Sequence, residues 1–212
     1  RDALGPHAWA AFVRDECIPH PAGDRLREDP FIHRCYCKPR GYAGDAVMLD
    51  LIYGAAPVPA GTTPLGRALF ACNRDATACR SVRERREILA AAIDAAGARA
   101  PGRARVLSLA CGHLREAQLS AAVRDGAVAA FYAVDQDPLA VALLHREHAA
   151  LGVTPQVGTV RDVLKGELAP AGLDLAYAAG LYDYLPGPVA ARLTRRVFDL
   201  LAPGGRLLVA NF

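Results

Sequence analysis

From Arg103 to Phe212 the sequence alternates short apolar runs with segments of helical length. This rhythm is typical of βαβ units, in which helices join parallel strands and cover both faces of the sheet. The expected strands cover residues 105–110, 130–135, 156–160, 173–178 and 206–212, and the expected helices cover residues 114–124, 138–150 and 189–201. We therefore predict an α/β fold with a doubly wound, mostly parallel sheet that binds its ligand at the carboxyl ends of the strands.

The first hundred residues show no convincing alternation of apolar and polar residues and carry helix signals instead. Asp29-Pro30 and Thr63-Pro64 each combine an N-cap residue with a proline at the first helical position, and Asp45 is a further candidate N-cap. The expected helices cover residues 6–18, 30–36, 46–53, 64–70 and 76–96. The chain thus divides into an all-helical region, residues 1–100, and a sheet domain, residues 101–212.

The helix expected at residues 76–96 contains a conspicuous charge run, residues 83–87. Helical periodicity places an apolar set on or near one face, namely Val82, Ile88, Leu89, Ala92 and Ile93. The charge run fills the remaining surface. We interpret it as a solvated helix face.

Composition excludes several classes of protein. The 212 residues, 52% of them hydrophobic, suffice for a folded core, and no apolar run approaches the roughly 20 residues that span a bilayer. The N-terminus lacks the layout of a signal peptide, so we expect a cytoplasmic protein without membrane insertion. A net charge of +3 is too small to indicate nucleic acid. The six cysteines show no paired CxxC spacing, so we expect reduced thiols and no metal.

The strand expected at residues 105–110 leads into a turn at Gly112 and then into a helix. A glycine here allows a ligand to approach the backbone, and a helix N-terminus offers free N–H groups to an anion. Ala110 and Leu114 stand where a dinucleotide fingerprint would have further glycines, which disfavours a nicotinamide enzyme. A tight turn without a ligand remains open for this segment alone. His113 is either a substituted turn residue or a base.

Two carboxylates follow the next expected strands. Asp135 comes about 20 residues after Gly112, where a carboxylate can accept both hydroxyls of an adenosine ribose. Asp137 is better explained as a helix cap. Asp162, just after the expected strand 156–160, either reaches an adenine amino group or serves as an ordinary turn residue. Gly180 then ends the fourth expected strand and leads into a polar cluster formed by Tyr182, Asp183 and Tyr184.

A Pro-Gly-Gly turn at residues 203–205, before the last expected strand, completes the set. Taken together and in this order, these segments resemble the class I S-adenosylmethionine-dependent methyltransferases. The resemblance spans residues 103–212, although only the middle glycine of the family's first motif is kept. It implies S-adenosylmethionine as cofactor, a Rossmann-like sheet and a set of cofactor-binding residues. From the sheet domain this set comprises Ala110, Gly112, Asp135, Gln136, Arg161, Asp162 and Gly180.

A narrower resemblance includes the segment Asp29-Pro-Phe-Ile-His-Arg-Cys-Tyr-Cys-Lys-Pro-Arg-Gly-Tyr-Ala-Gly-Asp45. With the motifs above, it is similar to the bacterial subfamily of extracellular factor biosynthesis, whose product is 3-hydroxypalmitic acid methyl ester. The resemblance implies that the N-terminal helices form a lid and that residues 38–45 fold over the cofactor. Tyr42 would pack on the methionine part of the cofactor, and Arg40 would pair with a carboxylate. It also implies two further strands that this chain does not contain. An ordinary connection between two helices is the alternative for residues 38–45.

Methyl transfer from a sulfonium is an in-line displacement, so the protein must chiefly orient the acceptor and exclude water. For a carboxylate acceptor, which the subfamily implies, no base is needed, and the orienting candidates are Arg40, Arg115, Tyr182 and Tyr184. Tyr36 is a further candidate for substrate binding. A phenol or alcohol acceptor would use Asp183 or His113 as a base. The predicted partner is a small molecule and not nucleic acid, with the oligomeric state open. The alternatives are a non-catalytic S-adenosylmethionine-binding module and a nicotinamide oxidoreductase.

Overall fold

The computed structural model describes residues 3–168 and 170–211. The chain divides into two compact units, Arg1–Val82 and Arg83–Phe212, and each unit has its own buried core. The division lies within helix α6 (Thr77–Arg99), whereas the sequence placed a boundary after residue 100. The two divisions differ because Leu89 and Ile93 of α6 belong to the core of the second unit.

The described residues of the first unit form helices and connecting turns. They are α1 (Gly5–Phe12), α2 (Ala22–Leu26), α3 (Pro30–Cys37), α4 (Ala46–Tyr53), α5 (Pro64–Asp75) and the beginning of α6. A π-helical turn (Val13–Cys17) continues α1, so the predicted helix 6–18 is confirmed. The short α2 was not predicted because its five residues lack a side-chain N-cap.

Two buried aspartates fix the helices of the first unit. Asp29 caps α3 by accepting the N–H of Phe31 at 2.8 Å, and its other oxygen accepts from Asn73 of α5 at 2.6 Å. Asp45 caps α4 and also accepts the Nε–H of Arg34 at 2.7 Å. The two N-cap residues predicted from the sequence, Asp29 and Asp45, therefore also join neighbouring helices.

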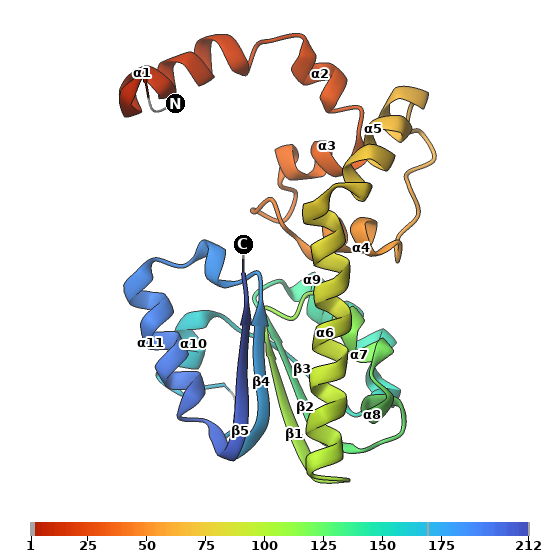
Figure 1. Ribbon diagram of the computed structural model, residues 1–212, viewed down its shortest axis with the longest axis vertical. Coiled ribbons are helices and arrows are strands. Elements are labelled where there is room, and N and C mark those ends of the chain that lie inside the picture. Colours follow the sequence, from red (N-terminus) through yellow and green to blue (C-terminus); the bar gives the residue numbers. More distant parts are fainter. Residues whose placement is uncertain (1–2, 169, 212) are drawn as a thin grey trace. The chain divides into compact units, whose positions relative to one another are not determined.

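The second unit contains a five-stranded sheet with all neighbouring strands parallel (Figure 1). The strands are β1 (Ala104–Leu109), β2 (Val128–Asp135), β3 (Val153–Val157), β4 (Leu173–Ala179) and β5 (Leu201–Ala210), in the order β3-β2-β1-β4-β5. This arrangement confirms the predicted doubly wound sheet. The strand order reverses between β1 and β4, which places the expected ligand crevice beside the carboxyl end of β1.

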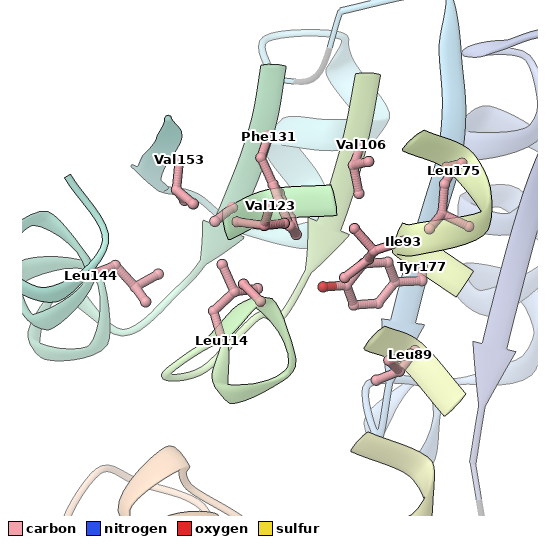
Figure 2. Packing of buried hydrophobic residues seen from close by; sticks show 13 residues of the cluster. Leu89, Ile93, Val106, Leu114, Val123, Phe131, Leu144, Val153, Leu175 and Tyr177 are labelled. Atoms are coloured by element: carbon pink, nitrogen blue, oxygen red, sulfur yellow. The ribbon is translucent and has the colours of Figure 1, made fainter. Parts of the chain in front are cut away.

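Helices cover both faces of the sheet (Figure 1). On one face lie the second half of α6, α7 (Arg115–Leu119), α8 (Ala121–Arg124) and α9 (Pro138–Glu147). Figure 2 shows the core on this face, where Leu89 and Ile93 of α6 gather with Phe131 and Tyr177 of the strands. On the other face, α10 (Val160–Lys165) and α11 (Gly187–Phe198) cover a second core that includes Leu193. Among the described residues, no helix combines the length and hydropathy needed to cross a bilayer.

Helix α10 was not predicted from the sequence, and β3, β5 and the helix expected at residues 114–124 also differ from the prediction. β3 lies three residues earlier than predicted, because Thr159 and Asp162 form a capping box that begins α10. The predicted helix 114–124 breaks at Ser120, whose hydroxyl caps α8 and donates to Asp94 at 2.6 Å. β5 begins at Leu201, and residues 202–205 form a bulge between two registers of its pairing with β4.

The interpretation of the charge run on α6 as a solvated face is confirmed for the exposed Glu84 and Glu87 but was wrong for Arg85 and Arg86. Arg85 and Arg86 are only half-exposed and their Nε atoms are buried, whereas Ile88 is 59% exposed. The helical register explains the error. Arg85 and Arg86 precede the buried Leu89 by four and three residues, which places them on the same side of α6, while Ile88 points elsewhere.

Candidate functional site

A pocket lies at the carboxyl ends of β1 and β2, where the strand order predicts a ligand. Three predicted cofactor residues line it, namely Ala110, Asp135 and Gln136. The sequence did not single out the rest of the lining, which is Leu109, Val134, Gly158, Thr159, Val160, Val163, Leu181 and Leu193. Its volume of about 60 Å³ is too small to enclose a nucleoside, so a ligand of that size would extend beyond it. The lining is mainly apolar, with the Asp135 carboxylate as its charged group.

The loop after β1 holds an unusual backbone conformation. Ala110, Gly112 and Leu114 have φ values of 51°, 54° and 49°, in the left-handed region that favours glycine. For each of the two non-glycine residues this conformation costs roughly 1–2 kcal/mol. The loop is held in place from both ends, because the Cys111 N–H donates to the Val134 carbonyl at 3.1 Å and the Leu114 side chain is fully buried. Residues 110 and 114, which are not glycine, are therefore held in a conformation that favours glycine.

Asp135 connects this loop to the end of β2. Its side chain is only 4% exposed; one oxygen accepts the Gly112 N–H at 2.7 Å and the other accepts the Asp137 N–H at 2.9 Å. Burial raises the pKa of Asp135, and the two N–H donors oppose that rise. Each carboxylate oxygen has a further lone pair. Asp135 can therefore hold the loop and still accept hydrogen bonds from ligand hydroxyls.

A second polar group lies on the α6 face of the sheet, and sequence reasoning missed it. The Tyr177 hydroxyl donates to Glu116 Oε1 at 2.7 Å, and both side chains are buried. Burial raises the pKa of Glu116, while the positive charges of Arg85 and Arg86 act in the opposite direction. A buried carboxylate with two nearby guanidinium groups requires tertiary packing that no local pattern encodes. The i, i+4 spacing of Arg85 and Leu89 places Arg85 on the buried side of α6, but it does not identify Glu116 as a neighbour.

Arg85 also approaches the carboxyl end of β4. Gly180 follows that strand with a φ of 83°, and a methyl group placed there would lie 3.6 Å from Nη1 of Arg85. The Nε atom of Arg85 is buried and makes no hydrogen bond within the described part of the chain. This cation is suited to an anionic group of a ligand that lies across the ends of β1 and β4.

The predicted catalytic cluster after β4 is a short 3₁₀ turn, Tyr182–Tyr184. The Tyr182 hydroxyl is 3.0 Å from the Thr194 hydroxyl of α11, whereas Asp183 and Tyr184 are exposed. His113 is buried near Asp135. The roles of these residues in catalysis stay predictions.

Other predicted residues already have structural partners. Arg115 pairs with Glu147 at 2.6 Å. Asp162 accepts from the Thr159 N–H and hydroxyl, and the hydroxyl bond in particular lowers the pKa of Asp162. Capping of α10 thus gives Asp162 a structural reason to be present, and its adenine contact stays a prediction. The neighbouring Arg161 is exposed.

Three predicted residues, Tyr36, Arg40 and Tyr42, belong to the first unit. Tyr36 is 57% exposed, and the guanidinium group of Arg27 stacks over its ring at 4.6 Å from the centroid. Arg40 and Tyr42 lie in the connection between α3 and α4. Their contacts with a cofactor stay predictions.

Known structures share this fold, although no protein-family model and no curated protein matches the sequence. A possible exported protein from Bordetella parapertussis is 22% identical, covers 94% of this chain and 69% of its own, and has a TM-score of 0.63. An S-adenosylmethionine-dependent methyltransferase from Thiobacillus denitrificans, in complex with S-adenosyl-L-homocysteine, is 21% identical over 76% of this chain and 54% of its own, with a TM-score of 0.44. An O-methyltransferase family protein from Burkholderia thailandensis is 20% identical over 68% of this chain and 41% of its own, with a TM-score of 0.46. The first similarity supports the assignment of the fold.

Proposed function

We propose that the protein is an S-adenosylmethionine-dependent methyltransferase that acts on a small-molecule acceptor. The observation that carries the proposal is the loop of residues 110–114, which contains three residues in the left-handed region and whose Gly112 N–H donates to the buried carboxylate of Asp135. Residues with strained backbone conformations cluster at active sites and ligand-binding segments. The sequence resemblance to class I methyltransferases supports the same assignment.

The residues of the second unit fit this cofactor. Asp135 would accept the ribose hydroxyls, the loop of residues 110–114 would contact the ligand through its backbone, and Arg85 would pair with the carboxylate of the methionine part. When bound, the cofactor supplies a methyl group activated by its sulfonium. The chain then has to orient the acceptor toward that methyl and exclude water. Tyr182 and Tyr184 are the proposed orienting residues.

Calorimetric titration with S-adenosylmethionine tests the cofactor site. Replacing Asp135 with alanine should weaken binding about 100-fold, because two charge-assisted hydrogen bonds are lost. The matched control is Asp125→Ala, an exposed aspartate between α8 and β2, which should bind like the unmodified chain. Equal affinity of the Asp135 variant and the control would overturn the proposal. Titration with NADH should give no heat of binding, and binding of NADH would favour the oxidoreductase alternative.

For the acceptor, we propose a carboxylate, with O-methylation of a fatty acid or a related natural-product acid as the reaction. Labelled S-adenosylmethionine incubated with long-chain acids, hydroxy acids and phenols separates the alternatives. Methyl esters should form from the acids. Methyl ethers from phenols would indicate a hydroxyl acceptor and a role for Asp183 or His113 as base. Cofactor binding without turnover on any acceptor would indicate a non-catalytic module.

We keep the prediction of a cytoplasmic protein. Its support is that all six cysteines are free thiols in the described structure, which suits a reducing compartment. The similar protein from B. parapertussis is described as a possible exported protein. Fractionation of the producing cell, followed by detection of the chain in the cytoplasmic or the secreted fraction, decides between the two compartments.

A further inference from the structure

A cationic groove lies between α10 and α11, which pack side by side on one face of the sheet. It consists of two hollows, of about 440 Å³ and 360 Å³, that share Leu164 and Arg192. The larger hollow also shares Val160 with the pocket that contains Asp135. We call this surface the α10–α11 groove.

Positive charge dominates the rim of the α10–α11 groove. Five cationic side chains line it, and they are Arg161, Lys165, Arg192, Arg195 and Arg196. Asp199 is the single carboxylate in the described lining. Helix α11 itself contains three arginines and no acidic residue.

Two of these arginines are available to a partner. Arg192 and Arg195 are exposed, and neither side chain takes part in an ion pair or hydrogen bond among the described residues. By contrast, Lys165 pairs with Glu167 at 3.4 Å, and the Nε–H of Arg196 donates to the Val163 carbonyl at 3.4 Å. The rim therefore presents unneutralised charge at the positions of Arg192 and Arg195.

The floor of the groove is apolar. Leu164, Leu185 and Val189 are half-exposed along it, and no described lining residue is aromatic. An apolar floor between cationic rims matches an amphipathic helix with an acidic polar face. A nucleic acid would use the arginines but has no aliphatic side to bury on this floor, and bases lack an aromatic surface here on which to stack.

We propose that the α10–α11 groove docks an acidic amphipathic helix of another protein. The helix places its apolar side chains on the leucine and valine floor and its carboxylates beside Arg192 and Arg195. Because Val160 belongs to both the groove and the Asp135 pocket, a partner seated there lies next to the proposed cofactor site. The docking surface is independent of the chemistry at that site.

Fluorescence anisotropy with a labelled synthetic helix tests the proposal on the full chain. The probe is a peptide of about 18 residues with leucines at helical i, i+3/i+4, i+7 spacing and glutamates elsewhere, and the comparison probe has the same composition with the leucines scattered. The patterned peptide should bind, and binding should weaken as salt rises. The double variant Arg192→Glu/Arg195→Glu should weaken binding at least about tenfold.

Two further variants complete the design. Ala191→Glu places a carboxylate in the groove from an exposed position of α11 and should also weaken binding. The control Arg146→Glu changes an exposed arginine on α9 and should leave binding unchanged. Equal binding of the two peptides, unchanged binding by the groove variants, or tighter binding of a single-stranded oligonucleotide that displaces the peptide would each overturn the proposal. Circular dichroism of each variant confirms that the chain remains folded.

Discussion

Two residues of the loop after β1 adopt a backbone conformation that their side chains disfavour. Ala110 and Leu114 have positive φ values, in the left-handed region that favours glycine. Leu114 compensates for the strain by filling the core on the α6 face (Figure 2), whereas Ala110 is exposed and gains no comparable packing. The strain at Ala110 is therefore the less compensated of the two.

Replacing Ala110 with glycine should make the chain more stable. Relief of the left-handed conformation outweighs the entropy that glycine adds to the unfolded chain, so we expect a gain of about 0.5–1 kcal/mol in the free energy of unfolding. Urea denaturation at neutral pH measures it. The control is Ala142→Gly, at an exposed position of α9, which should lose about 1 kcal/mol. A loss of stability in Ala110→Gly would contradict the assigned backbone conformation.

His148, which follows α9, should make stability depend on pH. Its side chain is fully buried, and burial lowers the pKa of His148 from the ordinary value of 6.5. The unfolded chain therefore binds a proton at a higher pH than the folded chain does. Stability from this residue is present above pH 6.5 and decreases as the pH falls through the lowered pKa, by at most about 1.4 kcal/mol per pH unit.

Urea denaturation at pH 7.5, 6.5 and 5.5 measures this dependence. The variant His148→Leu should flatten the dependence over this range, whereas His145→Gln, at an exposed position of α9, should retain it. If the His148 variant kept the full slope, another group would be responsible.

At the scale of elements, α6 has the largest consequence for the site. Its buried residues Leu89 and Ile93 attach it to the sheet, and the same register directs Arg85 toward Gly180 at the end of β4. The helix thus places a cation near the carboxyl end of β4 from outside the strands and their loops.

Replacing Arg85 with glutamine should selectively weaken ligands that carry the methionine carboxylate. We expect about a tenfold loss of affinity for S-adenosylmethionine, since the proposed charge pair between Arg85 and the methionine carboxylate is lost. Affinity for 5′-methylthioadenosine, which lacks the amino-acid part, should stay the same. Calorimetry with both ligands measures the difference. An equal loss for both ligands would assign Arg85 a structural role instead.

The sequence predicted elements well where a side chain marks their ends. Asp45 caps α4, which was predicted with its correct bounds, whereas β5 was misplaced because its Pro-Gly-Gly segment forms a bulge within the strand. In the candidate site, Gly112 and Asp135 could be paired from their spacing because consecutive parallel strands end at one edge. Arg85 and Glu116 could not be paired from the sequence, because the proximity of their side chains depends on how α6 packs on the sheet.

At the scale of the whole molecule, the two units allow the lid prediction and the cofactor proposal to be tested in one experiment. Hydrogen exchange read by mass spectrometry follows each segment separately. S-adenosylhomocysteine at 100 times its dissociation constant should stabilise the ligand-bound unit by up to about 2.7 kcal/mol, seen as slower exchange in residues 104–135. Residues 38–45 should also exchange more slowly if they fold over the cofactor.

The possible outcomes are distinct. If exchange in residues 104–135 is unchanged, the cofactor proposal is contradicted. If those residues are protected but exchange in residues 38–45 is unchanged, only the lid prediction is contradicted. A comparison without ligand provides the baseline for both segments.

The central position of β1 also affects how the chain is made. Its second neighbour, β4, is complete only at Ala179, about 70 residues after Leu109. A ribosome that adds about 5–20 residues per second needs roughly 4–14 s to synthesise that stretch. During this time one edge of an almost fully buried apolar strand has no partner and can pair with another nascent chain. The strand at the centre of the ligand site is thus also the segment most exposed to misassociation during synthesis.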